Sequence, residues 1–453
     1  DPDPDPDPDP DPDPDPDPDP DPDPDPGSGS LPVTPGDETQ PGLIPVVPAR
    51  LVDTRNGAKD TTIDGLFEGG ARLDDGGTFA FDVAGRGGVP DDAESVWLNV
   101  TVVGPSAAGH LTVYPCDQER PWASNVNYLF DQTVPNAVFT RIDGDGRVCV
   151  HAVAEMDLVV DVNAYAPPGT SVEAIAPARL LDTRGGPRDV TIDGEFEGAR
   201  RLAGGEAIEL DVAGRGGVPV DAGGVFLNVT VIDPATHGYL TVYPCGPERP
   251  LTSNVNFSPG ETTPRLVFSM LGDRGSVCLF SQSDLDLVVD VGAHVPDDRS
   301  VAALVPARLL DTRQGAADET IDGEFQGHGR LAAGDTIELD VIGRAGVPTH
   351  AQSVLLNITA VEASAPGHLI VHPCGTQRPW ASNGNYAIGS VSPNAVLAML
   401  GEDGRVCLYS LEEVDLVVDI SGYTFDPVAF AASSYTQVAR SLPNTMSRGF
   451  VAV

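Results

Sequence analysis

Apolar and polar residues alternate in short runs along most of this chain. Ser95–Val103, SVWLNVTVV, is typical: β-branched and aromatic residues alternate with polar ones, as in a strand that buries one face. Similar runs occur at Leu111–Tyr114, Ala137–Ile142, Arg147–Ala152 and Asp157–Tyr165. Turns rich in glycine and proline separate these runs, and no stretch of helical length follows a 3.6-residue period. The pattern therefore predicts an all-β chain.

One unit occurs three times. The stretch Gly109–Tyr128, GHLTVYPCDQERPWASNVNY, returns 129 positions later at Gly238–Phe257 and again at Gly367–Tyr386. Each unit holds about eight short strand patterns, which favours an antiparallel β-sandwich over a small closed β-barrel. A β-trefoil is disfavoured, because the unit has no threefold repeat of its own. We predict three tandem domains, at residues 46–168, 174–297 and 303–426.

The flanking segments have a different composition. Residues 1–30 are thirteen Asp-Pro pairs followed by a GSGS linker. Proline disfavours helix in the residue before it, so an extended polyproline II stalk is expected. Residues 31–45 read as an irregular linker, and residues 427–453 form a tail that does not match the repeat. We interpret the stalk as a spacer.

The net charge of the chain limits the kinds of partner that it can bind. The chain has 68 acidic and 26 basic Lys and Arg residues, for a formal net charge of −42. Such a surface repels phosphate backbones and anionic lipid, so nucleic acid is not an expected partner. No run of about 18 apolar residues is present, so no membrane span is predicted in this chain. No motif indicates a cofactor.

The six cysteines fall as two per repeat, 33 residues apart each time. No CxxC motif or Cys/His cluster accompanies them, which argues against zinc. One disulfide per domain, and therefore an oxidising compartment, is the favoured interpretation, with a pair of buried thiols as the alternative. The predicted pairs are Cys116–Cys149, Cys245–Cys278 and Cys374–Cys407.

Each repeat opens with Arg-Leu-x-Asp-Thr-Arg. On a strand, Asp53 and Arg55 point to the same face and Arg50 to the opposite one. We expect Arg55 to pair with a carboxylate of another strand, either Asp82 or Asp161. A structural ion pair is favoured over an acid/base pair. The corresponding residues in the other copies are Asp182, Arg184, Asp311 and Arg313.

Two further motifs are interpreted as structural rather than functional. Thr-Ile-Asp-Gly contains a natural Asx-turn residue, Asp64, and GRGGVP at Gly85–Pro90 reads as a tight corner between strands. Asn99, Asn228 and Asn357 each begin an Asn-x-Thr sequon. Because these asparagines lie in mid-strand, we interpret them as a polar face inside the sandwich or on its rim.

No catalytic or metal-binding constellation emerges. No histidine occupies the same position in all three copies, and His110 and His368 align with Tyr239. The chain has no GxSxG or HExxH motif. The Asp-Gly-Asp-Gly at Asp143 hints at calcium, but the second copy places Arg274 in this turn. We predict no catalytic residues and no metal site.

The best candidate binding residues follow the first cysteine of each repeat. There Arg120, Trp122, Asn125 and Asn127 combine an arginine, an aromatic ring and two amides that share one strand face. This set is suited to a sugar ring, although the amides are equally suited to capping backbone groups near the disulfide. In the second copy Leu251 replaces the tryptophan. The other candidate residues are Arg249, Asn254, Asn256, Arg378, Trp380, Asn383 and Asn385.

The motifs ARLLDTR, GRGGVP, LNVT, LTVYPCG, RPxxSNxN and DLVVDV together resemble a tandem repeat of secreted and cell-surface actinobacterial proteins, across about Val46–Phe425. The resemblance implies export and a β-rich domain, but no assigned activity. Two departures between the copies matter if this loop binds a ligand. Gly384 replaces a valine, and Arg265 stands where the other copies have Asn136 and Asn394.

We therefore expect a non-catalytic extracellular or cell-surface protein that serves display, adhesion or structural spacing. Its expected partner is a cell-wall or extracellular glycan or protein. The alternative is a carbohydrate-binding protein that uses the Asn-rich loops. A secreted hydrolase is disfavoured, because no general base is shared by the three copies.

Overall fold

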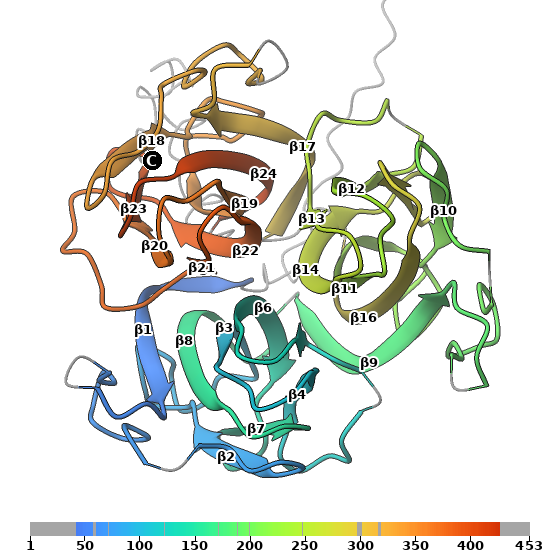
Figure 1. Cartoon of the computed structure of the whole chain (residues 1–453), viewed down its shortest axis with the longest axis horizontal. Coiled ribbons are helices and arrows are strands. Elements are labelled where there is room, and N and C mark those ends of the chain that lie inside the picture. The colour runs from blue at the N-terminus through green and yellow to red at the C-terminus, as the bar shows by residue number, and fades with distance from the viewer. Residues whose placement is uncertain are drawn as a thin grey trace, which may run out of the picture. The chain divides into compact units, whose positions relative to one another are not determined.

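A computed structural model describes residues 42–425, apart from 58–59, 71, 122, 171, 188, 199, 247, 297–300 and 316–318. The predicted Asp-Pro stalk, most of the linker and the C-terminal tail lie outside the described residues. The described residues form 24 strands and no helix (Figure 1). The prediction of an all-β chain is confirmed.

Each repeat contributes eight strands. The strands of repeat 1 are β1 (Ile44–Asp53), β2 (Thr78–Asp82), β3 (Ser95–Val103), β4 (Gly109–Pro115), β5 (Val126–Tyr128), β6 (Thr133–Arg141), β7 (Arg147–Ala152) and β8 (Asp157–Ala166). Those of repeat 2 are β9 (Glu173–Asp182), β10 (Ala207–Asp211), β11 (Ala222–Ile232), β12 (Gly238–Pro244), β13 (Val255–Phe257), β14 (Thr262–Met270), β15 (Ser276–Ser281) and β16 (Asp286–Pro296). Those of repeat 3 are β17 (Val301–Asp311), β18 (Thr336–Asp340), β19 (Ala351–Val361), β20 (Gly367–Pro373), β21 (Gly384–Tyr386), β22 (Val391–Met399), β23 (Arg405–Ser410) and β24 (Asp415–Phe425).

The strands of each repeat form two four-stranded antiparallel sheets. In repeat 1 the strand orders are β1-β8-β3-β6 and β2-β7-β4-β5, and the other repeats have the same two orders. The pairing is nested: first with eighth, second with seventh, third with sixth and fourth with fifth. Every sheet ends in two edge strands, so the alternative of closed barrels is not formed in the described part of the chain.

Both sheets of a repeat bury their apolar side chains in one core. In repeat 1, Leu51 and Leu98 from the first sheet and Leu111 and Val150 from the second all lie in a single cluster with 0% exposure. Repeats 2 and 3 have equivalent clusters. The alternation seen in the sequence therefore places one face of each strand in its own repeat's core.

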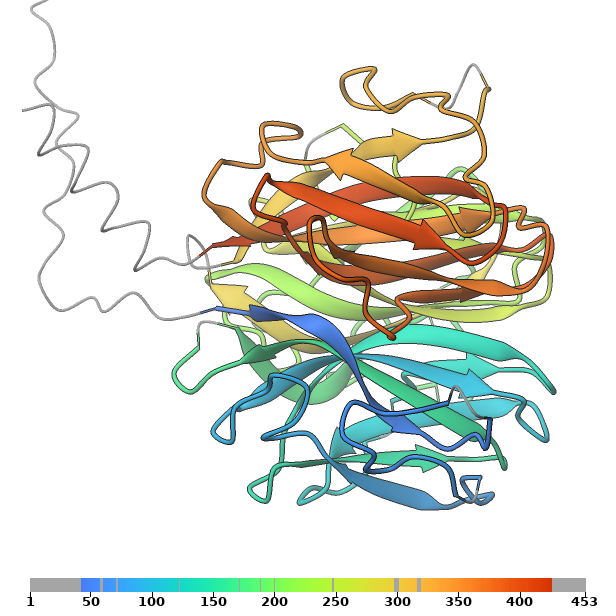
Figure 2. The same ribbon diagram turned by 90° about the vertical axis from the view of Figure 1, so that its left-hand side faces the viewer.

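A fourth core joins the three repeats. Trp97 and Phe139 from repeat 1 pack with Phe226 and Phe268 from repeat 2 and with Leu397 from repeat 3. The rings of Phe226 and Phe268 are 4.7 Å apart, and those of Trp97 and Phe226 are 5.5 Å apart. The edge strands β6, β14 and β22 contact one another at this centre. Figure 1 looks down the line where they meet, and Figure 2 shows the layered strands from the side.

Candidate functional site

The asparagines of the three sequons connect neighbouring repeats. Each is at most 9% exposed, and its Nδ2 donates to a backbone carbonyl of another repeat at 2.5–2.6 Å. The bonds run from Asn228 to Ser124, from Asn357 to Ser253 and from Asn99 to Ser382. The last bond joins repeat 1 to repeat 3, so the three repeats form a closed ring. These side chains lie between repeats, so the prediction that they face the inside of one sandwich or its rim is wrong.

The serines of the second and third Ser-Asn-x-Asn motifs are held through both their amide and their carbonyl groups. The backbone amide of Ser382 donates to Oδ2 of Asp161 at 3.0 Å, while its carbonyl accepts from Asn99. Asn99 and Asp161 are direct partners in the pairing of β3 with β8. The amide of Ser253 similarly donates to Asp419 at 3.2 Å. The repeated serine is therefore part of the ring contacts.

The ion pairs at the start of each repeat differ from the expectation. Arg55 pairs with Asp53 of its own strand end, at 2.7 Å, rather than with Asp82 or Asp161. Arg50 pairs with Asp161 and with Asp53, both at 2.9 Å. Arg50 was predicted on the face opposite to Asp53, but a register shift between Arg50 and Val52 interrupts the alternation. Arg55 follows the last residue of β1, Asp53, so the strand pattern did not determine its partner. The same pairs join Arg179 to Asp182 and Asp290, Arg184 to Asp182, Arg308 to Asp311 and Asp419, and Arg313 to Asp311.

These carboxylates stabilise the charge on the arginine. Burial by itself lowers the pKa of Arg50, but the Coulombic and hydrogen-bonding effects of Asp161 and then Asp53 outweigh it. The net result is a pKa above the ordinary value for arginine. Arg50 is therefore a permanently charged link between β1 and β8, beside the contact with repeat 3.

The sequence did not predict the role of a buried arginine in the GRGGVP corner. Arg86 pairs with Asp64 at 2.7 Å and donates to the carbonyl groups of Leu51 and Asp82 at 2.9 and 2.7 Å. Its guanidinium also lies 5.1 Å from the ring centre of Phe67. The available signal was the constant spacing of 22 residues between the aspartate of the TIDG motif and this arginine. The equivalents Arg215 and Arg344 pair with Asp193 and Asp322.

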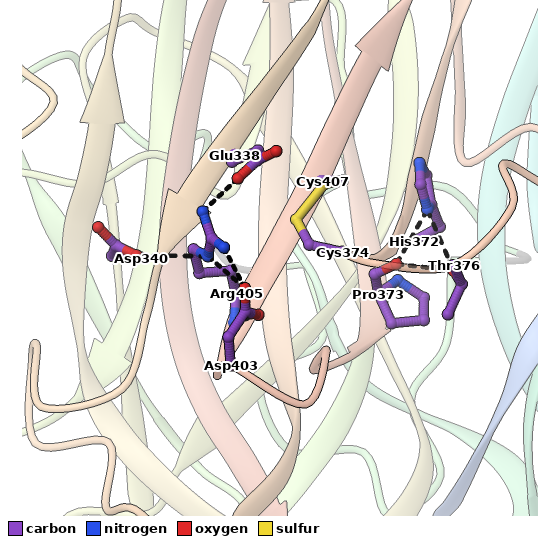
Figure 3. The surroundings of a disulfide bond; sticks show 9 residues. All are labelled: Glu338, Asp340, His372, Pro373, Cys374, Thr376, Asp403, Arg405 and Cys407. Carbon is purple, nitrogen blue, oxygen red and sulfur yellow. Dashed lines mark hydrogen bonds and ion pairs between the residues drawn. A yellow bond between two sulfur atoms is a disulfide. The ribbon is translucent and has the colours of Figure 1, made fainter.

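The three predicted disulfides are present, and the described residues contain no free cysteine. Figure 3 shows Cys374–Cys407, which joins the end of β20 to β23. Beside it Arg405 pairs with Asp403 and, across to β18, with Glu338. The disulfides indicate an oxidising, extracellular-type environment.

The predicted binding amides divide into two groups. In the first group, the side-chain oxygen of Asn125 accepts from the amide of Val113 at 2.7 Å, and Asn254 and Asn383 make the same contact in their repeats. This is the backbone capping that the sequence left open as the alternative to ligand binding. In the second group, Asn127, Asn256 and Asn385 line one cavity of about 450 Å³ to which all three repeats contribute.

A larger cleft lies between repeats 3 and 1, and we call it the closing cleft. Its volume is about 740 Å³, and its walls include Arg378, Trp380, Asn385, His368 and Tyr409. Repeat 1 contributes residues of β1, β3, β6 and β8. Trp380 is 78% exposed, and the guanidinium of Arg378 lies 3.6 Å from the ring centre of Tyr409. The fold thus brings together three of the predicted binding residues of repeat 3.

Besides its charged residues, this cleft contains neutral hydrogen-bonding groups. Asn385 Nδ2 donates to Oγ1 of Thr101 across the repeat boundary at 3.3 Å. Burial, together with the positive charges of Arg50 and Arg378, lowers the pKa of His368 below its ordinary value of 6.5. The imidazole is therefore neutral at pH 7 and presents one donor and one acceptor.

The other copies lack parts of this arrangement. In repeat 2, Arg249 lies 3.9 Å from the ring centre of Phe280, and Tyr239 replaces the histidine. Leu251, 73% exposed, replaces the tryptophan. In repeat 1, Arg120 is exposed and Trp122 lies outside the described residues. Repeat 3 therefore carries the most complete set of predicted binding residues.

Other kinds of site are not apparent in the described residues. No group of three or more His, Cys, Asp and Glu side chains there is placed to hold a metal ion. Asp143, in the turn that hinted at calcium, accepts from the amides of Asp145 and Arg147 at 2.9 and 2.8 Å, as in a hairpin turn. The same residues include no helix that is long and apolar enough to cross a membrane.

Comparison with known proteins finds no matching family model and no curated protein that matches. Two solved structures show a weak likeness. A structure of Sulfolobus turreted icosahedral virus is 8% identical, with a TM-score of 0.20, over 83% of this chain and 91% of the viral one. A structure of an archaeal virus described by its triple jelly-roll fold and turret assembly is 7% identical, with a TM-score of 0.19, over 84% and 90%. Because both TM-scores are low, neither likeness indicates the function of this chain.

Proposed function

We propose that each repeat is a β-sandwich domain of the jelly-roll type. The nested strand pairing supports this proposal, as does the single core shared by the two sheets of each repeat. Six four-stranded sheets also suit a six-bladed propeller. The blades of a propeller, however, are built from strands that follow one another in sequence, unlike β1-β8-β3-β6.

We further propose that the chain is a non-catalytic extracellular or cell-surface module in which three such domains act as one rigid body for display, adhesion or structural spacing. The observation that carries the proposal is the use of the repeated polar residues. Asn99, Ser382 and Asp161 bind one another across a repeat boundary, and Arg50 binds Asp161. Residues that recur in every copy are thus engaged in holding the repeats together.

Exported full-length protein tests this proposal. We expect all six cysteines to be oxidised when the protein is isolated from the medium, and the three repeats to unfold in one cooperative transition. Mass spectrometry without reduction and urea denaturation measure the two properties. Three separate unfolding transitions would contradict the rigid body. Hydrolysis of a polysaccharide or peptide, abolished by Asp53→Asn, would contradict the non-catalytic assignment.

A second candidate function is carbohydrate binding in the closing cleft. It is favoured by an exposed indole, Trp380, beside a cleft that also contains Tyr409, Asn385 and neutral His368. Aromatic faces stack on the apolar face of a sugar ring, and amide and imidazole groups bind its hydroxyl groups. The ring-like closure of the repeats supplies the second wall of this site.

A glycan array probed with the wild-type protein tests this second function. Trp380→Ala should weaken binding about ten- to a hundredfold, because it removes about 1.5–3 kcal/mol of apolar burial. Leu251→Ala is the matched control, since it truncates an exposed apolar side chain at the equivalent position of repeat 2 and should leave binding unchanged. Absence of glycan binding by the wild-type protein, or equal binding by Trp380→Ala, would refute it.

A further inference from the structure

All three repeats contribute to one cavity where the edge strands β6, β14 and β22 meet. We call this cavity of about 450 Å³ the axial cavity. Equivalent residues of the three copies line it, among them Asn127, Asn256 and Asn385, and Thr133 and Thr262. Its walls are therefore rich in amide and hydroxyl groups that repeat around the centre of the molecule.

One residue breaks this threefold equivalence. Asn136 and Asn394 occupy the same position in repeats 1 and 3, and each donates its Nδ2 to the sequon asparagine of the next repeat. Asn136 reaches Asn228 at 3.3 Å, and Asn394 reaches Asn99 at 2.8 Å. Repeat 2 has Arg265 instead, and this side chain lines the axial cavity.

Arg265 is buried and forms no ion pair with a described acidic residue. It is only 6% exposed, its Nη1 donates to the carbonyl groups of Pro264 and Pro135 at 2.7 and 3.5 Å, and its Nε is buried with no hydrogen-bond partner. None of the acidic residues that the structure describes forms an ion pair with it. The other buried arginines of the described part each pair with an aspartate at 2.6–2.7 Å: Arg86, Arg215 and Arg344.

The guanidinium nevertheless carries a charge at neutral pH. Burial lowers the pKa of Arg265 to about 10, and nearby Glu261 opposes the shift. Glu261 lines the same cavity, and its carboxylate accepts from the amide of Ser258 at 3.2 Å. An unpaired buried charge costs several kcal/mol, and an anion in the cavity would offset that cost.

We propose that the axial cavity binds the carboxylate of a small hydroxylated ligand, with Arg265 as its counter-ion. A guanidinium fork matches a carboxylate in geometry. The asparagine side chains of the three repeats and the threonine side chains of repeats 1 and 2 bind the ligand's hydroxyl groups. Glu261 and Asp131 line the same cavity and repel any anion, so a ligand with a single negative charge is favoured over a doubly charged phosphate or sulfate.

The other copies provide the test variant. Arg265→Asn places in repeat 2 the residue that repeats 1 and 3 already hold there, so the fold accommodates it. Without ligand we expect this variant to be at least as stable as the wild-type protein, since it removes the unpaired charge. Arg265→Lys retains the charge without the fork and serves as a second variant.

The probes are glucuronate, glucose and sulfate, measured by calorimetry on the full-length protein. Glucuronate should bind the wild-type protein, and an excess of glucose, which lacks the carboxylate, should not displace it. Arg265→Asn should weaken glucuronate binding about ten- to a hundredfold, the usual effect of losing a charged hydrogen-bonded pair. Trp380→Ala should leave it unchanged, which separates this site from the closing cleft.

Any of three results would overturn the assignment. The first is that the wild-type protein does not bind glucuronate. The second is that Arg265→Asn binds glucuronate as tightly as the wild-type protein does, and the third is that sulfate binds more tightly than glucuronate. Weaker binding by Arg265→Lys than by the wild-type protein supports recognition by the guanidinium fork, and equal binding argues against it.

Discussion

The bond from Asn99 to Ser382 closes the ring, and replacing Asn99 with alanine tests that closure directly. If the repeats formed an open row, Asn99 would lie on a free outer face of repeat 1. Its loss would then change stability by no more than about 0.5 kcal/mol, as for most surface substitutions. In the closed ring the substitution removes a contact between the first and last repeats.

The expected cost follows from the contacts. Asn99 is 2% exposed, it donates to Ser382 O at 2.6 Å, and its Oδ1 accepts from Asn394 at 2.8 Å. Alanine leaves the buried carbonyl of Ser382 without this donor and takes one acceptor from Asn394. Each unsatisfied buried group costs about 1–3 kcal/mol, and Asn394 keeps its bond to the carbonyl of Asn383, so Asn99→Ala should lower the free energy of unfolding by about 2–4 kcal/mol.

Urea unfolding with the disulfides intact measures this loss. Asn228→Ala and Asn357→Ala are the matched controls, because they remove the same bond between repeats 1 and 2 and between repeats 2 and 3. All three variants should be destabilised, Asn357→Ala least, because repeat 2 has Arg265 where Asn136 and Asn394 donate to the other two sequon asparagines. A large loss in the two controls with almost none in Asn99→Ala would refute the closed ring.

Two further predictions concern buried charged and titratable groups. Arg86→Ala should lower the free energy of unfolding by about 3–5 kcal/mol, because it leaves Asp64 and two carbonyl groups without their partner, whereas exposed Arg120→Ala should have almost no effect in the same urea assay. Stability should also fall as the pH decreases from 7 to 5: burial lowers the pKa of five histidines in the folded state, so the unfolded chain binds more protons in this range. These histidines are His110, His151, His294, His368 and His372. Thermal unfolding between pH 5 and 7.5 measures this effect, and an unchanged melting temperature would contradict it.

Local structure was predictable from the sequence where a residue type or pattern has one dominant structural role. Cysteines at constant spacing without metal-binding neighbours predicted the disulfides that the structure contains, such as Cys116–Cys149. Asp64 was expected in an Asx turn, and its Oδ1 accepts from the amide of Leu66 at 3.1 Å. Alternating runs predicted strands because a sheet face that packs on a core selects apolar residues at every second position.

The contacts between repeats were not predictable in the same way. An asparagine in the middle of a strand, such as Asn99, has the same sequence pattern whether its side chain meets water or another repeat. The partner of Arg50 was also hidden, because a bulge changes the face on which later residues lie and leaves no clear mark in the alternation. The closing cleft could not be predicted either, because it depends on contacts between repeats. Two of its residues, Arg50 and Trp380, come from opposite ends of the described chain.

The hydrogen bond between the first and last repeats also determines how many repeats this architecture can hold. Open arrays of repeats grow by adding units, and their terminal units need polar caps to shield an exposed contact face. Here each contact face is covered by another copy. Asn99 donates to Ser382 between repeats 1 and 3 just as Asn228 donates to Ser124 between repeats 2 and 1, so none of the three repeats is terminal. A fourth copy would have to break one of the three contacts and widen the centre packed by Trp97 and Phe226. Three is therefore a number set by geometry, and duplication or loss of a single repeat should destroy the assembly rather than lengthen or shorten it.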